Sequence, residues 1–138
     1  MALDVEGIAK YLKLIDRLPY VSAPGDILFT AHTITEIAGE EEREQMKKTV
    51  RRDAIRRSQY LQEFVHEHPD MPRELERWAL HSAYAYRSLG QALGTKELEA
   101  IRTSAKRVGE LEDICSNLSY AMSLVKAERA LSSYNCFL

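Results

Sequence analysis

Apolar side chains recur at steps of three and four residues along most of the chain. This spacing places them on one face of a helix and predicts amphipathic helices. Four such stripes run through residues 5–15, 27–65, 75–93 and 98–125. No stretch alternates for long with the two-residue period of a half-buried strand. The core residues that these stripes predict include Trp78, Leu89, Ile101, Val108, Leu118 and Met122.

Helix-breaking residues separate the stripes. Prolines interrupt the chain within residues 18–26 and 66–72, and Gly94 ends the third helix shortly before the fourth. Gly39 either ends a helix or weakens a longer one, since glycine costs about 1 kcal/mol relative to alanine in a helix interior. We favour one long, kinked helix over residues 26–66.

The short connections require neighbouring helices to run antiparallel. The sequence therefore predicts an all-α fold, an antiparallel up-and-down bundle of four helices with two long helices, or of five helices if the chain breaks at Gly39. A chain of 138 residues has the length of one domain and buries about two-thirds of its unfolded surface. We expect residues 1–138 to form a single helical-bundle domain.

The composition, with 45% apolar and 29% charged residues, is that of a globular protein. A formal net charge of −2 at pH 7 argues neither for nor against a polyanionic partner. Cys115 and Cys136 form no metal-binding motif and indicate reduced thiols in the cytoplasm. The sequence shows neither a signal peptide nor a long apolar span, so we expect a cytoplasmic protein without membrane contact.

The segment around His32 resembles the motif of histidine phosphotransfer domains over residues 31–39, AHTITEIAG. Those domains place a lysine three residues after the histidine and a glycine at the fourth position, where this chain has Thr35 and Glu36. A glutamate one helical turn away would repel a phosphohistidine. We therefore expect His32 to be an ordinary helix residue paired with Glu36.

Motifs for metal binding and nucleophilic catalysis are incomplete. A di-iron bundle needs two Glu-x-x-His motifs, and the chain has one, from Glu63 to His66. The acids within residues 40–44 and 110–113 resemble the metal-binding carboxylates of MazG-type pyrophosphohydrolases, but their separation is too long for that family. The sequence contains neither a GxSxG motif nor a glycine-rich phosphate loop. We therefore predict no catalytic residue, metal ion or cofactor, and we do not expect an enzyme.

Basic residues are concentrated in KKTVRRDAIRR, residues 47–57, which hold six of them and one acid. Lys48, Arg52 and Arg56 follow each other at four-residue steps, which predicts one solvent-facing row. Such a row either balances the acids nearby, binds a phosphate backbone or binds an acidic protein. The candidate contact residues are Lys47, Lys48, Arg51, Arg52, Arg56 and Arg57.

The C-terminal segment ALSSYNCFL is uncharged. Free tails are usually polar, so an apolar tail indicates docking on its own domain or on a neighbour. Tyr134, Phe137 and Leu138 are the candidate contact residues of this tail.

Three hypotheses of function follow. We favour a non-catalytic helical-bundle interaction protein, either a homo-oligomer or a small subunit of a larger assembly. The alternative is a helical subunit of a ribonucleoprotein or DNA-associated complex that binds the nucleic-acid backbone through the basic residues in 47–57. The third is an enzyme or phosphorelay component whose site assembles from residues distant in the sequence.

Overall fold

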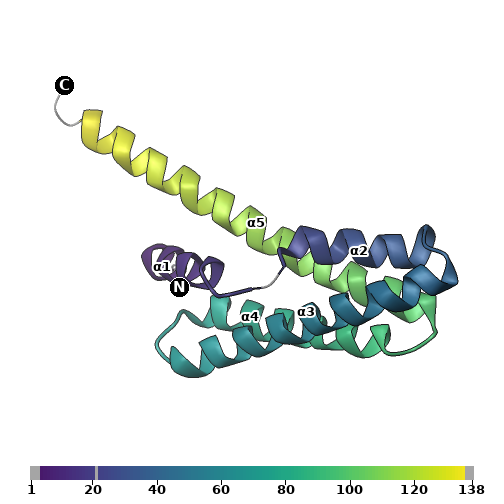
Figure 1. The fold of residues 1–138 in the computed structure, drawn as a ribbon. Helices are drawn as coiled ribbons and strands as arrows, with labels where there is room; N and C mark the ends of the chain where they lie inside the picture. Colours follow the sequence, from purple (N-terminus) through teal and green to yellow (C-terminus); the bar gives the residue numbers. More distant parts are fainter. Residues whose placement is uncertain (1–3, 21, 136–138) are drawn as a thin grey trace.

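The computed structural model describes residues 4–20 and 22–135, and for 126 and 129–135 it describes the backbone alone. These residues form five helices and no strand, which confirms the predicted all-α fold (Figure 1). Two of the helices, with 28 and 38 residues, are long, as predicted. The five are α1 (Val5–Asp16), α2 (Pro24–Glu36), α3 (Glu40–Glu67), α4 (Arg73–Leu93) and α5 (Leu98–Asn135).

The chain breaks before Gly39, so the single kinked helix that we favoured over residues 26–66 is wrong. Ile37 leaves helical geometry at φ −121° and ψ −46°, and Gly39 is extended at φ −70° and ψ 168°. Three successive glutamates occupy the first turn of α3, where the positive end of the helix dipole favours acids. The break therefore places the acidic run at the N-terminus of a separate helix. Helix α2 folds back against α3.

Arg43 stabilises the α2–α3 connection from the first turns of α3. Its guanidinium donates to the carbonyl oxygens of Ile34 at 2.9 Å and Ala38 at 3.1 Å. The Ile34 carbonyl lies in the last turn of α2, where a helix has no partners of its own for its carbonyls, and the Ala38 carbonyl lies in the connection to α3. A single side chain of α3 therefore binds both the end of α2 and the connection that follows it.

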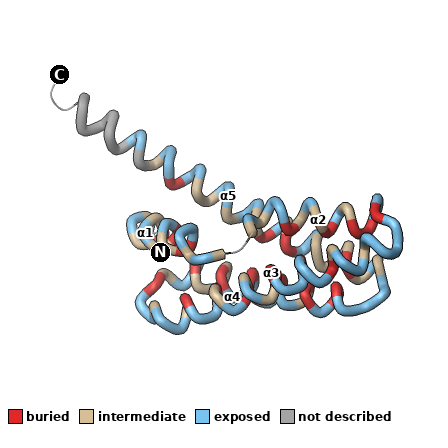
Figure 2. Tube along the Cα trace, viewed as in Figure 1, coloured by how far each residue is buried: buried red, intermediate tan, exposed pale blue. Residues whose placement is uncertain are grey.

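The core lies where α4 packs between α3 and α5, with α2 covering α3 and α5 (Figure 2). Of the six predicted core residues, Leu89, Ile101, Val108 and Met122 are buried. Trp78 and Leu118 are half-buried and pack at the edge of the core. We call the packed part, comprising α2, α3, α4 and residues 98–113 of α5, the body.

The short helix α1 lies outside the body and packs against α5 through its apolar stripe. Ile8, Leu12 and Ile15 are buried, and the carboxylate of Asp4 caps the helix by accepting from the Gly7 N–H at 3.0 Å. Tyr11 reaches α3, with its ring centroid 6.3 Å from that of Phe64. This helix therefore connects the end of α3 with the second half of α5.

Helix α5 continues beyond the body as a projecting segment, which we call the arm (residues 114–135) (Figure 1). At 1.5 Å per residue the whole helix is about 57 Å long. Within residues 112–125 only Met122 is buried, and it lines the grooves beside α1. None of the helices in the described part of the chain is long and apolar enough to cross a membrane.

Candidate functional site

The six basic residues predicted as one contact surface are divided between two environments. Lys47 is buried, and its Nζ donates to the Thr95 carbonyl at 2.7 Å and lies 3.4 Å from Glu44. Arg51 is exposed overall, but its guanidinium lies beside the same turn, since a Cβ on Gly94 would be 3.2 Å from its Cζ. Both charges lie at the C-terminus of α4, where the helix dipole favours cations. They stabilise the α4–α5 connection.

Arg57 is also used inside the protein. Its Cζ lies 3.7 Å from the ring centroid of Tyr20, and its Nη1 donates to the Ser22 carbonyl at 3.0 Å. On the other side, the Ser22 hydroxyl donates to Asp53 Oδ2 at 2.7 Å. Arg57 and Asp53 together hold the segment between α1 and α2 against α3.

Lys48, Arg52 and Arg56 remain exposed on α3. Arg52 Nε lies 3.5 Å from Asp53 Oδ1, a long ion pair rather than a hydrogen bond. The other two side chains extend into solvent on the same face, as their four-residue spacing predicts. We call these three residues the basic row.

A polar cleft of about 680 Å³ surrounds Arg57 and was not evident in the sequence. It is lined by the α1–α2 connection, by Arg57 of α3, and by Glu112, Cys115 and neighbouring serines of α5. The hydroxyl of Tyr86 donates to Glu112 Oε1 at 2.7 Å. Partners in this network lie 26 to 35 residues apart in the chain, so no local motif reveals it.

The chemistry of the cleft fits a structural network. Burial, and then the carboxylate of Glu112, raises the pKa of Tyr86 far above its ordinary value. Burial also raises the pKa of the Cys115 thiol to about 11, so this thiol is protonated at neutral pH and is a poor nucleophile. Asp16 and Glu112 line the cleft together with Arg57, so neither an anion nor a cation meets a uniform field there.

His32 is exposed on α2, and its expected partner, Glu36, binds a different residue. Glu36 Oε1 accepts from Arg102 Nε of α5 at 2.7 Å. The predicted His32–Glu36 pair is therefore replaced by a contact across 66 residues of sequence. No group of three or more His, Cys, Asp or Glu side chains within the described ranges is placed to hold a metal ion.

The arm carries a second surface. Ile114 is 51% exposed, Tyr120 68% and Leu124 49%. Ile114, Asn117, Ala121 and Leu124 follow each other at steps of three, four and three residues, and all are exposed. We call these four residues the arm stripe.

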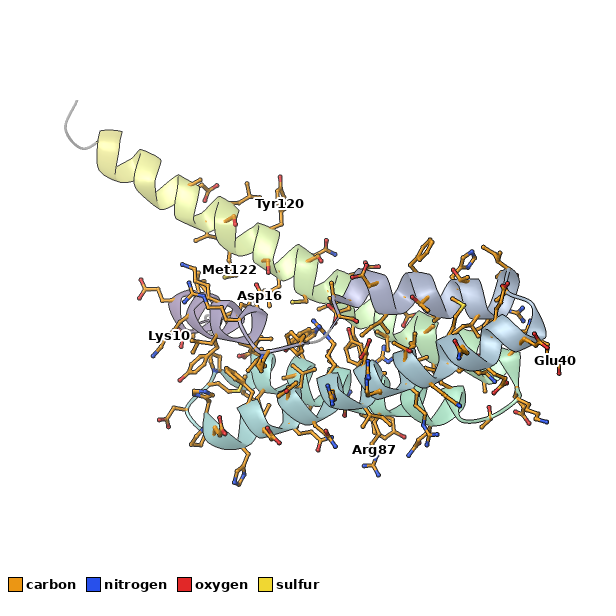
Figure 3. The ribbon with its side chains drawn as sticks, in the orientation of Figure 1. Lys10, Asp16, Glu40, Arg87, Tyr120 and Met122 are labelled. Atoms are coloured by element: carbon orange, nitrogen blue, oxygen red, sulfur yellow. The ribbon has the colours of Figure 1, made fainter. Side chains whose placement is uncertain are left out.

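The arm stripe lies about a third of a turn around α5 from Met122, which faces α1. Figure 3 shows Met122 on the α1 side of the helix and Tyr120 on the side turned away from the body. The arm therefore has one apolar face covered by α1 and a second that is exposed.

The exposed face of α5 changes from charged to uncharged side chains at Ile114. Within the body the same face carries Glu99, Lys106 and Glu110, all exposed. Residues 114–125 contain no charged side chain. The three- and four-residue steps of the arm stripe are visible in the sequence, but the longer core stripe of the same helix conceals them.

Of the predicted apolar tail, Tyr134 belongs to α5, but its side chain lies outside the described residues. Phe137 and Leu138 lie outside them altogether. The docked tail stays a prediction.

No protein-family model matches the chain, and neither a curated protein sequence nor a solved structure is significantly similar to it.

Proposed function

We propose that the protein is a non-catalytic interaction protein that binds another protein through the arm stripe. The observation that supports this most is that residues 114–125 carry no charged side chain on their exposed face, whereas the same face of α5 carries Glu99, Lys106 and Glu110 in the body. A solvated helix face normally carries charged side chains. This face has the composition of a surface that another helix or groove covers.

The energetics of the arm support a partner. Helices in water gain most of their stability from packing of an apolar face. Full burial of a leucine or isoleucine side chain contributes about 1.5–3 kcal/mol, and Ile114 and Leu124 are each about half exposed. A partner that covers the arm stripe would recover this free energy and stabilise the projecting helix.

We further infer that the body is an antiparallel up-and-down bundle of α2, α3, α4 and the first part of α5 within a single domain. The connections between these helices span residues 37–39, 68–72 and 94–97, which favours antiparallel neighbours. The cytoplasmic location stays a prediction.

Nucleic-acid binding is the second candidate, and the basic row supports it. Lys48, Arg52 and Arg56 are exposed on one rigid helix at intervals of about 6 Å. Three cations give a weak, salt-sensitive contact with a phosphate backbone. The acid-rich start of α3 lies on the same helix and opposes such a contact.

A photo-crosslinker at position 120 tests the proposal. Tyr120 lies beside the arm stripe, so replacing it with p-benzoylphenylalanine should yield protein adducts in cells on irradiation. Leu124→Glu should abolish these adducts, since it places a charge in the covered surface. Ser123→Glu, which adds the same charge on the other side of the arm, should leave them intact. Adducts that persist in Leu124→Glu, or that require nucleic acid, would contradict the proposal.

A further inference from the structure

We propose that a groove between α2 and α3 binds a small aliphatic amine, whose ammonium group is held by Asp26 and Asp53. This site is separate from the arm stripe and does not depend on the proposed function. It is supported by the acceptor-rich lining of the groove, by a buried carboxylate oxygen that lacks a donor and by the apolar side chains beside it.

The groove has a volume of about 350 Å³ and lies where α2 packs against α3. Its polar lining comes from both helices and from the connection before α2, and consists of Ser22, Asp26, Thr30, Gln45, Thr49 and Asp53. Two of these side chains are carboxylates, and none of the described lining residues is basic. A ligand in the groove therefore meets negative charge, which favours a cation.

The protons of two groove hydroxyls are used inside the protein. Ser22 donates to Asp53 Oδ2 at 2.7 Å, and Thr30 donates to the Asp26 carbonyl at 2.8 Å. A hydroxyl has one proton and two lone pairs, so in this arrangement both oxygens can only accept a further hydrogen bond. Together with the two carboxylates they form a surface of acceptors, which matches a primary ammonium with its three N–H donors.

Asp53 provides the most buried of these acceptors. The residue is 7% exposed, and its Oδ1 accepts no hydrogen bond from any part of the chain that the structure describes. Arg52 Nε lies 3.5 Å from this oxygen, which is a long ion pair, and the Arg52 side chain is 56% exposed. A buried acceptor without a donor is costly. An ammonium that displaces Arg52 into solvent would supply the missing hydrogen bond.

The rest of the lining favours an organic cation over a metal ion. Ile27 and Val50 are buried, Met46 is half-buried, and all three line the groove. The alkyl chain of an amine would cover these side chains, whereas a hydrated metal ion would gain nothing from them. Calcium also takes about six to eight oxygen ligands, more than two carboxylates supply. The volume lies near the lower limit of small-molecule sites, about 300 Å³, so a short amine fits.

Titration with n-butylamine at neutral pH tests the site, followed by the amide NMR signals of the full ¹⁵N-labelled chain. Signals from residues 26–30 and 45–53 should shift and saturate with a Kd of about 1 mM, since so small a ligand binds weakly. Butyltrimethylammonium has the same charge but no N–H donor, and its binding should be about fivefold weaker or less. 1-Butanol has the alkyl chain without the charge and should produce no saturable shift.

Substitutions identify the groups that hold the ammonium. Asp26 is exposed, so Asp26→Asn should keep the fold and weaken butylamine binding about fivefold. Asp53→Asn should have a similar effect on binding. Arg52→Gln should strengthen binding, because it removes the cation that competes for Asp53. Asp113→Asn, which removes an exposed carboxylate on α5, is the matched control and should leave the affinity unchanged. Circular dichroism of each variant checks that the helices are retained.

Several results would overturn the proposal. These are no saturable shift of the groove signals with butylamine, or equal affinity for butylamine and butyltrimethylammonium. An equal loss of affinity in Asp26→Asn and Asp113→Asn would show a general charge effect and would also overturn it. Saturation of the same signals by calcium or magnesium chloride at lower concentration than by butylamine would assign the groove to a metal ion instead.

Discussion

The guanidinium of Arg57 stacks on the ring of Tyr20, with 3.7 Å between Cζ and the ring centroid. The contact joins α3 to the α1–α2 connection, and the Ser22 carbonyl bound by Arg57 adds a second attachment. The neighbouring residue Arg56 is exposed. Two adjacent arginines of one basic segment therefore have different roles, one structural and one free to meet solvent or a partner.

Arg57→Met should lower the free energy of unfolding by about 2–3 kcal/mol, through the loss of a charge-assisted hydrogen bond and a cation–π contact. Urea denaturation followed by circular dichroism measures this change. Arg56→Met is the matched control, and its effect should stay within about 0.5 kcal/mol. Equal effects of the two substitutions would show that the Arg57–Tyr20 contact contributes no net stability.

Tyr86→Phe should lower the free energy of unfolding by about 1–3 kcal/mol, because it removes the hydroxyl that donates to Glu112 and leaves that carboxylate without this donor. Thermal and urea unfolding both report the loss. Tyr84 lies two residues earlier on α4 and is 72% exposed, so Tyr84→Phe should be nearly neutral. A neutral Tyr86→Phe would indicate that solvent replaces the hydroxyl at no cost.

The Cys115 thiol should reduce stability at alkaline pH. Burial, and then the carboxylates of Glu112 and Asp16, raises its pKa from 9.0 to about 11. The unfolded chain therefore loses this proton first as pH rises, so the stabilising contribution is complete below pH 9 and is lost between about pH 9 and 11. The free energy of unfolding, measured across this pH range, should fall less steeply in Cys115→Ser than in the unchanged protein. The native thiol should also react slowly with iodoacetamide at pH 8, and rapid reaction would contradict its burial.

The basic row separates the interaction-protein proposal from the nucleic-acid alternative. We expect no tight binding to bulk RNA or DNA at physiological salt, measured by fluorescence anisotropy at several salt concentrations. Tight binding that is lost when Lys48, Arg52 and Arg56 are all changed to glutamate would favour the alternative. Three lost phosphate contacts would lower the log–log salt slope by about 2–3.

A charge-matched control for that experiment lies on α4. Arg73, Arg77 and Arg87 are exposed there, and changing all three to glutamate alters the net charge by the same amount. Equal losses of binding in the two triple variants would indicate a general charge effect rather than a contact with the basic row.

The sequence predicted the helices well because their apolar stripes are local and strong. It did not predict the break before Gly39, since the three- and four-residue spacing continues across it and Arg43 closes the end of α2. The division of the basic residues depends on where α4 ends, because Lys47 binds the Thr95 carbonyl, 48 residues away. Contacts of this kind depend on the tertiary arrangement, and local spacing carries no information on them.

Helix α5 passes from the body into the arm without a proline, the residue most often found at a sharp helix bend. The arm and the core residues Ile101 and Val108 therefore belong to one continuous helix. The same helix that carries Leu124 on the arm packs against α4 in the body. A molecule bound at the arm stripe would lie outside the body and be joined to it by this single helix.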